Sequence, residues 1–180
     1  MIRFVCSSNL FEKELRNIMD FEIDYLSPTE GILYIESDDR NQLDLFCVQM
    51  AQEKGITLTC LECYAQDELT TKALSFAHRL NPNKVHRLST ILFIAIIQKN
   101  QPLLDDMISF VRSISPVLLD FARAYIDNGG NAIKTSTHLF VHRNTINNRL
   151  NQFYDETKMD LRDTENVKAL EIILNYQLYS

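Results

Sequence analysis

A run of hydrogen-bonding side chains near the C-terminal end of the chain could read double-stranded DNA. Arginine can bind guanine in a bidentate way, and asparagine can bind adenine in the same way. Residues 128–154 contain no Asp or Glu, whereas Lys134, Arg143 and Arg149 give this segment a formal charge of +3. The candidate DNA-contacting residues are Lys134, Thr135, His142, Arg143, Asn144, Thr145, Asn147, Asn148 and Arg149.

The net charge of the whole chain is best understood by separating this segment from the rest. The 180 residues include 18 Lys+Arg and 24 Asp+Glu, so the net charge is −6 and the remainder carries −9. This acidic total excludes a generally basic nucleic-acid coat but leaves a local positive field possible. The composition, 46% hydrophobic and 23% charged, is typical of a globular protein and excludes disordered and collagen-like classes.

Two short helices are expected to position the candidate side chains. The glycines at 129–130 are expected to end a preceding helix, and Asn131 can cap the next one. We predict a helix over 132–139, a tight connection at 140–142 and a second helix over 143–152. This is helix-turn-helix geometry, in which the second helix lies in the major groove. The predicted inward positions are Ile133, Ser136, Leu139, Val141, Ile146 and Leu150.

A second interpretation of these residues stays open at this point. Helices on a solvated protein surface often carry the same polar side chains, and many helical hairpins have such a face. The amino-acid types by themselves therefore fit either a DNA-reading helix or a plain surface helix.

Several sequence strings in the last third of the chain follow one another in a specific order. These strings are Leu119, Ala124-Tyr125, Asn128-Gly129-Gly130-Asn131, Leu139-Phe140-Val141-His142-Arg143-Asn144-Thr145-Ile146, Arg149-Leu150, Asp160-Leu161-Arg162-Asp163 and Ala169-Leu170. In this order they resemble the C-terminal helix-turn-helix domain of the PucR/CdaR family, bacterial regulators of purine catabolism and sugar-diacid use. The resemblance covers about residues 118–178 and implies a Fis-like, DNA-binding module.

The chain departs from the family pattern in the same region. Asn147 and Asn148 stand where the family often has a basic and an aromatic residue, which removes an expected phosphate contact. Ser136 replaces the usual Ala. Residues 71–93 also resemble the family's segment ahead of the DNA-binding domain, where a GGDEF-like domain usually stands. That domain is expected to be truncated here, with only one or two strands before the helices.

The expected fold is mostly α, with a small α/β N-terminal part and a C-terminal helix-turn-helix bundle. Strands are predicted at 32–35 and 56–64, on either side of a helix at 40–53. From residue 67 onward the chain is expected to be helical. The expected caps of the 40–53 helix are Asp38 or Asp39 at its start and Gly55 at its end. The expected domains are a regulatory or dimerisation region at 1–115 and a DNA-binding domain at 116–180.

Enzyme, metal and membrane functions find little support in the sequence. Cys60 and Cys63 form a C-x-x-C pair, but residues three apart in a strand point to opposite faces, which favours plain buried cysteines over a zinc or redox site. No catalytic or phosphate-binding motif is present, so we predict no enzyme activity, no cofactor and no metal. The longest apolar run, 91–97, is far shorter than a membrane span. No signal peptide is visible, and a cytoplasmic protein is expected.

Three functions remain as hypotheses. The first is a transcriptional regulator that binds double-stranded DNA as a homodimer. The second is a protein-interaction module that keeps the fold without the DNA contacts, which the acidic total and the asparagines at 147–148 would suit. The third is a sensor of an unknown small-molecule effector, with its pocket in the α/β part.

Overall fold

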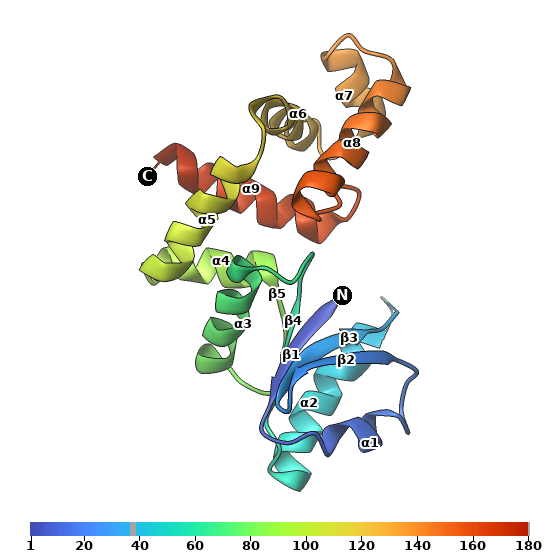
Figure 1. The fold of residues 1–180 in the computed structure, drawn as a ribbon, viewed down its shortest axis with the longest axis vertical. Coiled ribbons are helices and arrows are strands. Elements are labelled where there is room, and N and C mark those ends of the chain that lie inside the picture. Colours follow the sequence, from blue (N-terminus) through green and yellow to red (C-terminus); the bar gives the residue numbers. More distant parts are fainter. Residues whose placement is uncertain (37–38, 180) are drawn as a thin grey trace. The chain divides into compact units, whose positions relative to one another are not determined.

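Short β-prone runs in the first half of the chain come together in one five-stranded sheet. The computed structural model describes residues 1–36 and 39–179, and the chain divides into two compact units, Met1–Ile91 and Leu92–Ser180. The strand order in the first unit is β2-β3-β1-β4-β5 (Figure 1). The elements are β1 (Ile2–Cys6), α1 (Phe11–Leu15), β2 (Glu22–Ser27), β3 (Glu30–Tyr34), α2 (Arg40–Lys54), β4 (Leu58–Glu62), α3 (Glu68–Leu80) and β5 (Val85–Arg87).

The sheet has the topology of two interlocked βαβ units. Strand β1 lies between β3 and β4 and pairs antiparallel with both, β2 pairs antiparallel with β3, and β5 adds parallel to β4. This order of β1-α1-β2-β3-α2-β4 is the split βαβ arrangement of ferredoxin-like folds. The expectation of only one or two strands before the helices is wrong, because four strands precede α3.

The strands predicted at 32–35 and 56–64 correspond to β3 and β4, whereas β1, β2 and β5 escape the sequence prediction. Strand β1 is mostly buried on both faces, so it lacks the alternation of apolar and polar residues that marks a half-buried strand. Strands β2 and β5 lie at the two edges of the sheet. Edge strands carry more polar residues and give a weaker signal.

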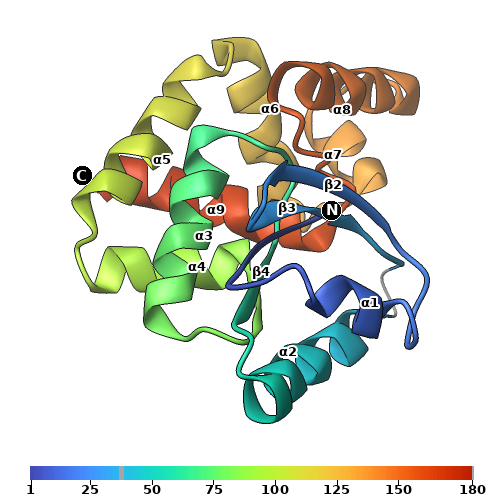
Figure 2. The ribbon, with the colours of Figure 1, turned by 60° about the horizontal axis from the view of Figure 1, so that its bottom comes forward.

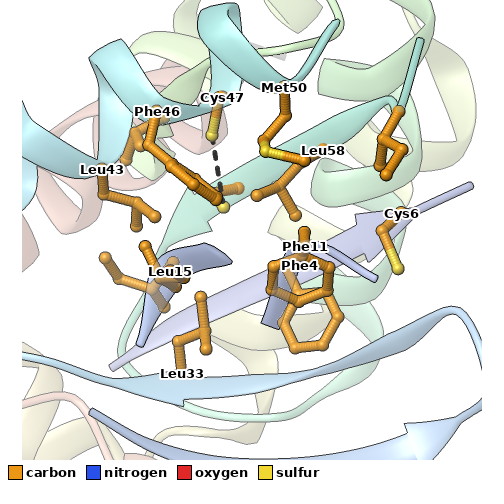
Figure 3. Close-up of a cluster of buried hydrophobic side chains, with 14 of the residues drawn as sticks. Phe4, Cys6, Phe11, Leu15, Leu33, Leu43, Phe46, Cys47, Met50 and Leu58 are labelled. Atoms are coloured by element: carbon orange, nitrogen blue, oxygen red, sulfur yellow. Dashed lines mark hydrogen bonds between the residues drawn. The ribbon is translucent and has the colours of Figure 1, made fainter. Parts of the chain in front are cut away.

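One face of the sheet is covered by α1 and α2. Phe4 on β1 meets Phe11 on α1 in an edge-to-face contact with ring centroids 5.1 Å apart, and both side chains are fully buried. Leu43 and Met50 of α2 lie above the same face, spaced two turns apart on one side of the helix (Figure 3). This cluster is the core of the first unit, and it buries one side of α2.

Gly31 on β3 is required by the close approach of neighbouring atoms. A Cβ at this position would lie 2.5 Å from the carbonyl oxygen of Asp24 on β2 and 2.7 Å from the ring of Phe4. Both contacts are shorter than real Cβ atoms make, and one involves main chain, which cannot move aside easily. The central sheet therefore tolerates only glycine here.

Helix α3 covers the opposite face of the sheet, and Figure 2 separates it from α1 and α2. Arg3 of β1 points to this side and is 3% exposed, with its guanidinium donating to the hydroxyls of Thr70 and Thr71 in the first turn of α3. Asp67 caps α3 by accepting from the backbone N–H of Thr70 at 2.8 Å. Alternate residues of β1 thus bind different helices on the two faces.

All four cysteines are free and buried, as plain buried cysteines should be. The sulfur of Cys60 on β4 lies 4.0 Å from that of Cys47 on α2. Cys63 follows the end of β4 and is also buried. Burial raises the pKa of the Cys63 thiol to about 11, which keeps it protonated at neutral pH.

The predicted caps of α2 have different outcomes. Asp39 occupies the N-cap position but makes no side-chain capping hydrogen bond, and Asp38 lies outside the described residues. Gly55 ends α2 in the left-handed conformation, as predicted.

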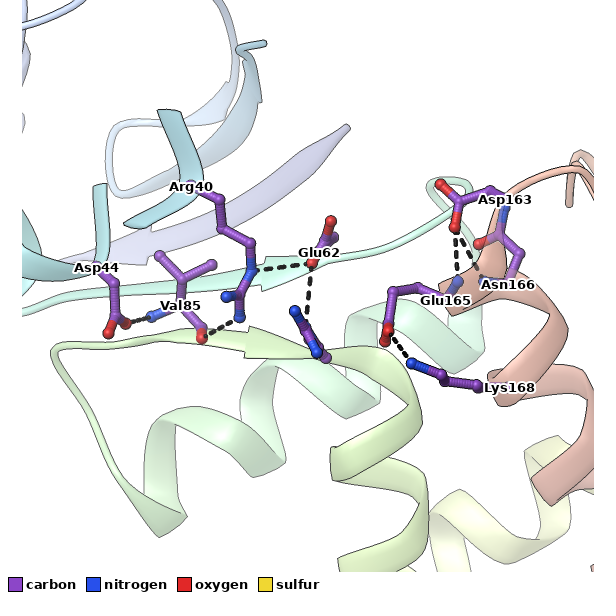
Figure 4. Close-up of polar contacts among 9 residues, drawn as sticks. Arg40, Asp44, Glu62, Val85, Asp163, Glu165, Asn166 and Lys168 are labelled. Carbon is purple, nitrogen blue, oxygen red and sulfur yellow. Dashed lines mark hydrogen bonds and ion pairs between the residues drawn. The ribbon is translucent and has the colours of Figure 1, made fainter. Parts of the chain in front are cut away.

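Polar contacts between α2 and the last two strands hold the β5 edge. The Asp44 carboxylate accepts from the backbone N–H of Val85 at 2.7 Å, and Arg40 donates to the Val85 carbonyl at 3.2 Å (Figure 4). Arg40 also pairs with Glu62 of β4 at 3.0 Å. The three-residue strand β5 is therefore held by side chains of α2 as well as by its pairing with β4.

The second unit is helical throughout its described residues. Its apolar core combines α5, α6 and α9 with residues of α8, and no strand occurs in residues 92–179. The mostly α fold with a small α/β N-terminal part is thus confirmed. The elements are α5 (Gln101–Ser113), α6 (Pro116–Asp127), α7 (Ala132–His138), α8 (Arg143–Thr157) and α9 (Thr164–Tyr179), while α4 (Leu88–Ile97) crosses from the first unit into the second.

The two compact units meet between residues 91 and 92, whereas the division into functional regions at 115 and 116 stays a prediction. Helix α5 packs against α9, which explains why it groups with the C-terminal helices. The backbone N–H of Ser115 also donates to the carboxylate of Glu156 at the end of α8. No helix in the part of the chain that the structure describes combines the length and apolarity needed to cross a bilayer.

Candidate nucleic-acid interface

The junction between α6 and α7 is built by local hydrogen bonds that the sequence predicts. Gly129 and Gly130 both have positive φ, and their N–H groups donate back to the carbonyls of Ile126 and Tyr125 at the end of α6. The side-chain oxygen of Asn131 accepts from the first backbone N–H groups of α7 at 3.0 and 3.1 Å. The predicted glycine stop and the asparagine cap are both confirmed.

The connection between α7 and α8 is a tight turn with a defined hydrogen-bond pattern. The N–H of Phe140 donates to the carbonyl of Thr137 at 3.3 Å, and the N–H of Val141 donates to the carbonyl of Ser136 at 3.0 Å. Phe140 itself has φ +55. This is the Schellman ending of a helix, and its left-handed position is usually occupied by glycine.

Helix α8 begins at Arg143, as predicted, but continues to Thr157 instead of ending near 152. His142 is its N-cap, and the Nδ1 atom of the ring accepts from the backbone N–H of Asn144 at 3.2 Å. One ring nitrogen of this candidate DNA ligand therefore has a structural task, while the side chain stays exposed at the start of the helix.

One side of α8 is buried and the other is polar and exposed. Ile146, Leu150 and Phe153 recur at helical spacing, are at most 2% exposed, and fix the rotation of the helix within the unit. The first two turns consequently direct hydrogen-bonding groups to solvent. The exposed candidates on α8 are Arg143, Asn144, Thr145, Asn147 and Asn148, and Lys134 is exposed on α7.

Arg149 differs from the other candidates on α8. Its side chain is half-buried, and its Nη1 atom donates to the side-chain oxygen of Gln152 at 3.1 Å. The guanidinium is thus held along the helix, beside the exposed polar face.

Thr135 must be removed from the set of candidate contacts. It is 0% exposed, and its hydroxyl donates to the Asn131 carbonyl at 2.8 Å within α7. Conversely, the predicted inward residue Ile133 is 62% exposed, and Leu139 and Val141 are also exposed. A helix of seven residues has one inward face, and contacts with α6 and α8 set its rotation so that Thr135 points inward. A prediction from apolar residues alone therefore assigns the wrong face of α7 to the interior.

Arg162 is a basic residue beside α8 that the candidate set omits. Its Nη2 atom donates to the side-chain oxygen of Asn151 on α8 at 2.6 Å, and its Nη1 atom pairs with Asp160 at 3.1 Å. The resemblance string Asp160-Leu161-Arg162-Asp163 contains this residue, which is the only signal in the sequence for it.

The loop that carries Arg162 leads directly into the last helix. Asp163 accepts from the backbone N–H groups of Glu165 and Asn166 at the start of α9, and Lys168 pairs with Glu165 at 2.8 Å (Figure 4). Leu170 and Leu174 of α9 are buried, whereas Leu178, one turn further along, is exposed. The α8–α9 connection is thus fixed at both of its ends.

Comparison with known proteins gives a family match and a similarity to a solved structure. Residues 118–175 match the PucR C-terminal helix-turn-helix domain. The solved structure is that of a regulator of polyketide synthase expression from Bifidobacterium adolescentis, with 16% sequence identity and a TM-score of 0.49 over 99% of this chain and 79% of that chain. A search of curated proteins found no match. Residues 118–175 are therefore similar to the helix-turn-helix domain at the C-terminal end of PucR proteins.

Proposed function

We propose that the protein is a transcriptional regulator that places α8 in the major groove of double-stranded DNA. The observation that carries the proposal is the division of α8 between a buried apolar ridge and an exposed face of arginine and asparagine. A recognition helix needs this division, because the ridge holds the helix while its first turns reach the base edges. The match to a PucR-type domain supports the same function.

The exposed side chains suit distinct contacts. Arg143, in the first turn, fits guanine, and Asn144 and Asn147 fit adenine. Lys134 on α7 and Thr145 on α8 suit phosphate oxygens, which dominate affinity without reading sequence. Asn148 and Arg149 belong to the same proposed set of DNA-contacting residues, and we place the Arg149 guanidinium near the edge of the groove. His142, the N-cap of α8, completes the set.

A second copy of the chain is part of the proposal. A single short recognition helix buries little surface, and two helices about 34 Å apart bind successive major grooves on one side of the duplex. Linking two weak half-sites raises the overall affinity without any new contact. We infer a homodimer of a cytoplasmic bacterial regulator that binds a two-fold DNA site.

Fluorescence anisotropy with labelled duplex DNA, selected from a random library and titrated across a salt series, tests the proposal. The wild type should bind, with affinity falling linearly in log–log form as salt rises. Arg143→Ala should weaken binding to the selected site by about 5- to 150-fold, since a bidentate base contact is worth ~1–3 kcal/mol. Arg79→Ala, which removes an exposed arginine of α3, is the matched control and should bind as the wild type does.

Two results would contradict the proposal. The first is an absence of DNA binding by the wild type at low salt. The second is equal loss of affinity in Arg143→Ala and Arg79→Ala, which would indicate charge without recognition. A folded chain that binds no DNA but captures a protein partner would favour the interaction-module hypothesis.

A hollow in the first unit favours a small-molecule effector as a second, compatible role. It has a volume of about 810 Å³ and lies among the segment that follows α1, the start of β2 and the end of β3, with Phe21, Tyr34 and Ile35 among its lining residues. That volume is within the usual range for ligand sites. Thermal unfolding of the full chain with a panel of metabolites tests this role: a binder should raise Tm in the wild type and less in Tyr34→Ala.

A further inference from the structure

The turn between α7 and α8 exposes apolar side chains that are not part of the core of the second unit. We call Ile133, Leu139, Phe140 and Val141 the turn patch. Phe140 is 96% exposed, the highest value among the large exposed hydrophobic residues. Its neighbours in the patch are between 36% and 62% exposed.

The backbone makes the presence of phenylalanine at this position more notable. Phe140 occupies the left-handed position of the Schellman ending of α7, with φ +55. Glycine adopts this conformation without cost, whereas a bulky side chain is strained there. A fully exposed aromatic ring gains no burial energy in return. Neither packing nor backbone geometry within this chain accounts for Phe140, and strained residues of this kind concentrate at functional sites.

The charges around the turn patch identify what can cover it. Lys134, His138, His142 and Arg143 surround it in the sequence and are all exposed, and residues 128–154 contain no acid. A second copy of the same surface would bring Lys134 and Arg143 close to their own like charges, which is unfavourable. A polyanion meets no such repulsion, and its phosphates complement the cations that flank the patch.

Duplex DNA also offers an apolar group where the patch would meet it. The C5 methyl of thymine projects into the major groove, and phenylalanine is among the side chains that contact it. Phe140 precedes Arg143 by three residues, so their Cα atoms are at most about 11 Å apart, within the reach of the two side chains along a groove. On the basis of the proposed function, we propose that Phe140 is a specificity-determining residue that packs against a thymine methyl at the edge of the site that α8 enters.

The test removes the methyl from the DNA before it changes the protein. Each thymine of a selected binding site is replaced in turn by deoxyuridine, which lacks only the methyl group, and full-length protein is titrated by anisotropy. At one thymine or more the wild type should lose about fourfold in affinity, the effect of exposing one buried methyl. Phe140→Gly should bind the thymine and deoxyuridine sites equally, and Phe140→Leu should retain part of the preference.

Loss of folding is not expected to account for the binding result with Phe140→Gly. Glycine suits the left-handed position, so Phe140→Gly should unfold at the same temperature as the wild type or higher. Leu45→Ala, which removes an exposed apolar side chain of α2, is the matched control and should keep the full deoxyuridine effect.

Three outcomes would overturn the inference while leaving DNA binding intact: no thymine whose replacement matters, a deoxyuridine effect that persists in Phe140→Gly, or a selected site without thymine. Sedimentation adds a fourth, because dissociation of a wild-type dimer by Phe140→Gly would assign the turn patch to a second copy. Failure of the proposed function has a different signature, since the wild type would then select no DNA at all.

Discussion

The hydroxyl of Thr135 in α7 donates to the main-chain carbonyl of Asn131, 2.8 Å away, while the side chain of Asn131 caps the start of the same helix. These two residues set both the start and the rotation of α7. The rotation turns Thr135 inward and leaves Lys134 and Ile133 at the surface. The exposed surface of α7 is therefore defined by a cap one turn away.

Asn131→Ala should destabilise the second unit by about 1 kcal/mol, because the first N–H groups of α7 lose their acceptor. Urea unfolding followed by circular dichroism measures the change. Asn41→Ala replaces an exposed asparagine within α2 and should have no destabilising effect, since alanine favours a helix interior. Equal stability of the Asn131 variant and the wild type would show that the cap contributes nothing.

Substitution of Lys134 should lower DNA affinity and substitution of Thr135 should lower stability, although the sequence predicts both residues as DNA contacts. Lys134→Ala should weaken DNA binding uniformly across sequences and reduce the salt slope by about one unit, as expected for a lost phosphate contact. Thr135→Val keeps the buried shape, so DNA affinity should stay within about twofold of the wild type while stability falls by ~0.5–1.5 kcal/mol through the lost hydrogen bond. A loss of affinity in Thr135→Val without a loss of stability would contradict its assignment to the core.

Gly31→Ala should destabilise the first unit by about 2–4 kcal/mol, because the new Cβ would meet the Asp24 carbonyl and the Phe4 ring. Gly55→Ala is the comparison, since no atom lies within 4 Å of its Cβ position but φ is +64. It should cost only about 1 kcal/mol, from the left-handed backbone. The two variants, compared by denaturant midpoint, separate steric clash from conformational strain, and a larger effect at Gly55 would refute this account.

Stability should fall as pH rises from about 9 towards 11. Burial raises the pKa of Cys63 from 9.0 to about 11, so the folded state binds a proton that the unfolded state has lost in this range. The stabilisation is complete below the unfolded pKa and disappears as pH passes the folded one. Unfolding at pH 8 and pH 10.5 measures the decline, which should be smaller in Cys63→Ala. An identical decline in that variant would assign the effect to other groups.

The helix-turn-helix region shows how far local sequence information reaches. The glycine stop at 129–130, the Asn131 cap and the start of α8 at Arg143 follow from short-range hydrogen bonds. The exposed face of α8 follows from the spacing of Ile146 and Leu150, because a long helix with a clear apolar ridge has one possible rotation. These features depend on residues within one or two turns of one another, so the residue types alone suffice to predict them.

Tertiary contacts decided the rest. The place of β1 between β3 and β4, the meeting of Cys47 with Cys60 and the inward rotation of Thr135 each depend on partners distant in sequence or on neighbouring helices. A short strand or a seven-residue helix carries too few residues for its own pattern to select a buried face, and the surrounding elements select it instead. The sequence by itself determined where the helix-turn-helix segment lies and what it contains, whereas only the packing of α7 decided which of its side chains face outward.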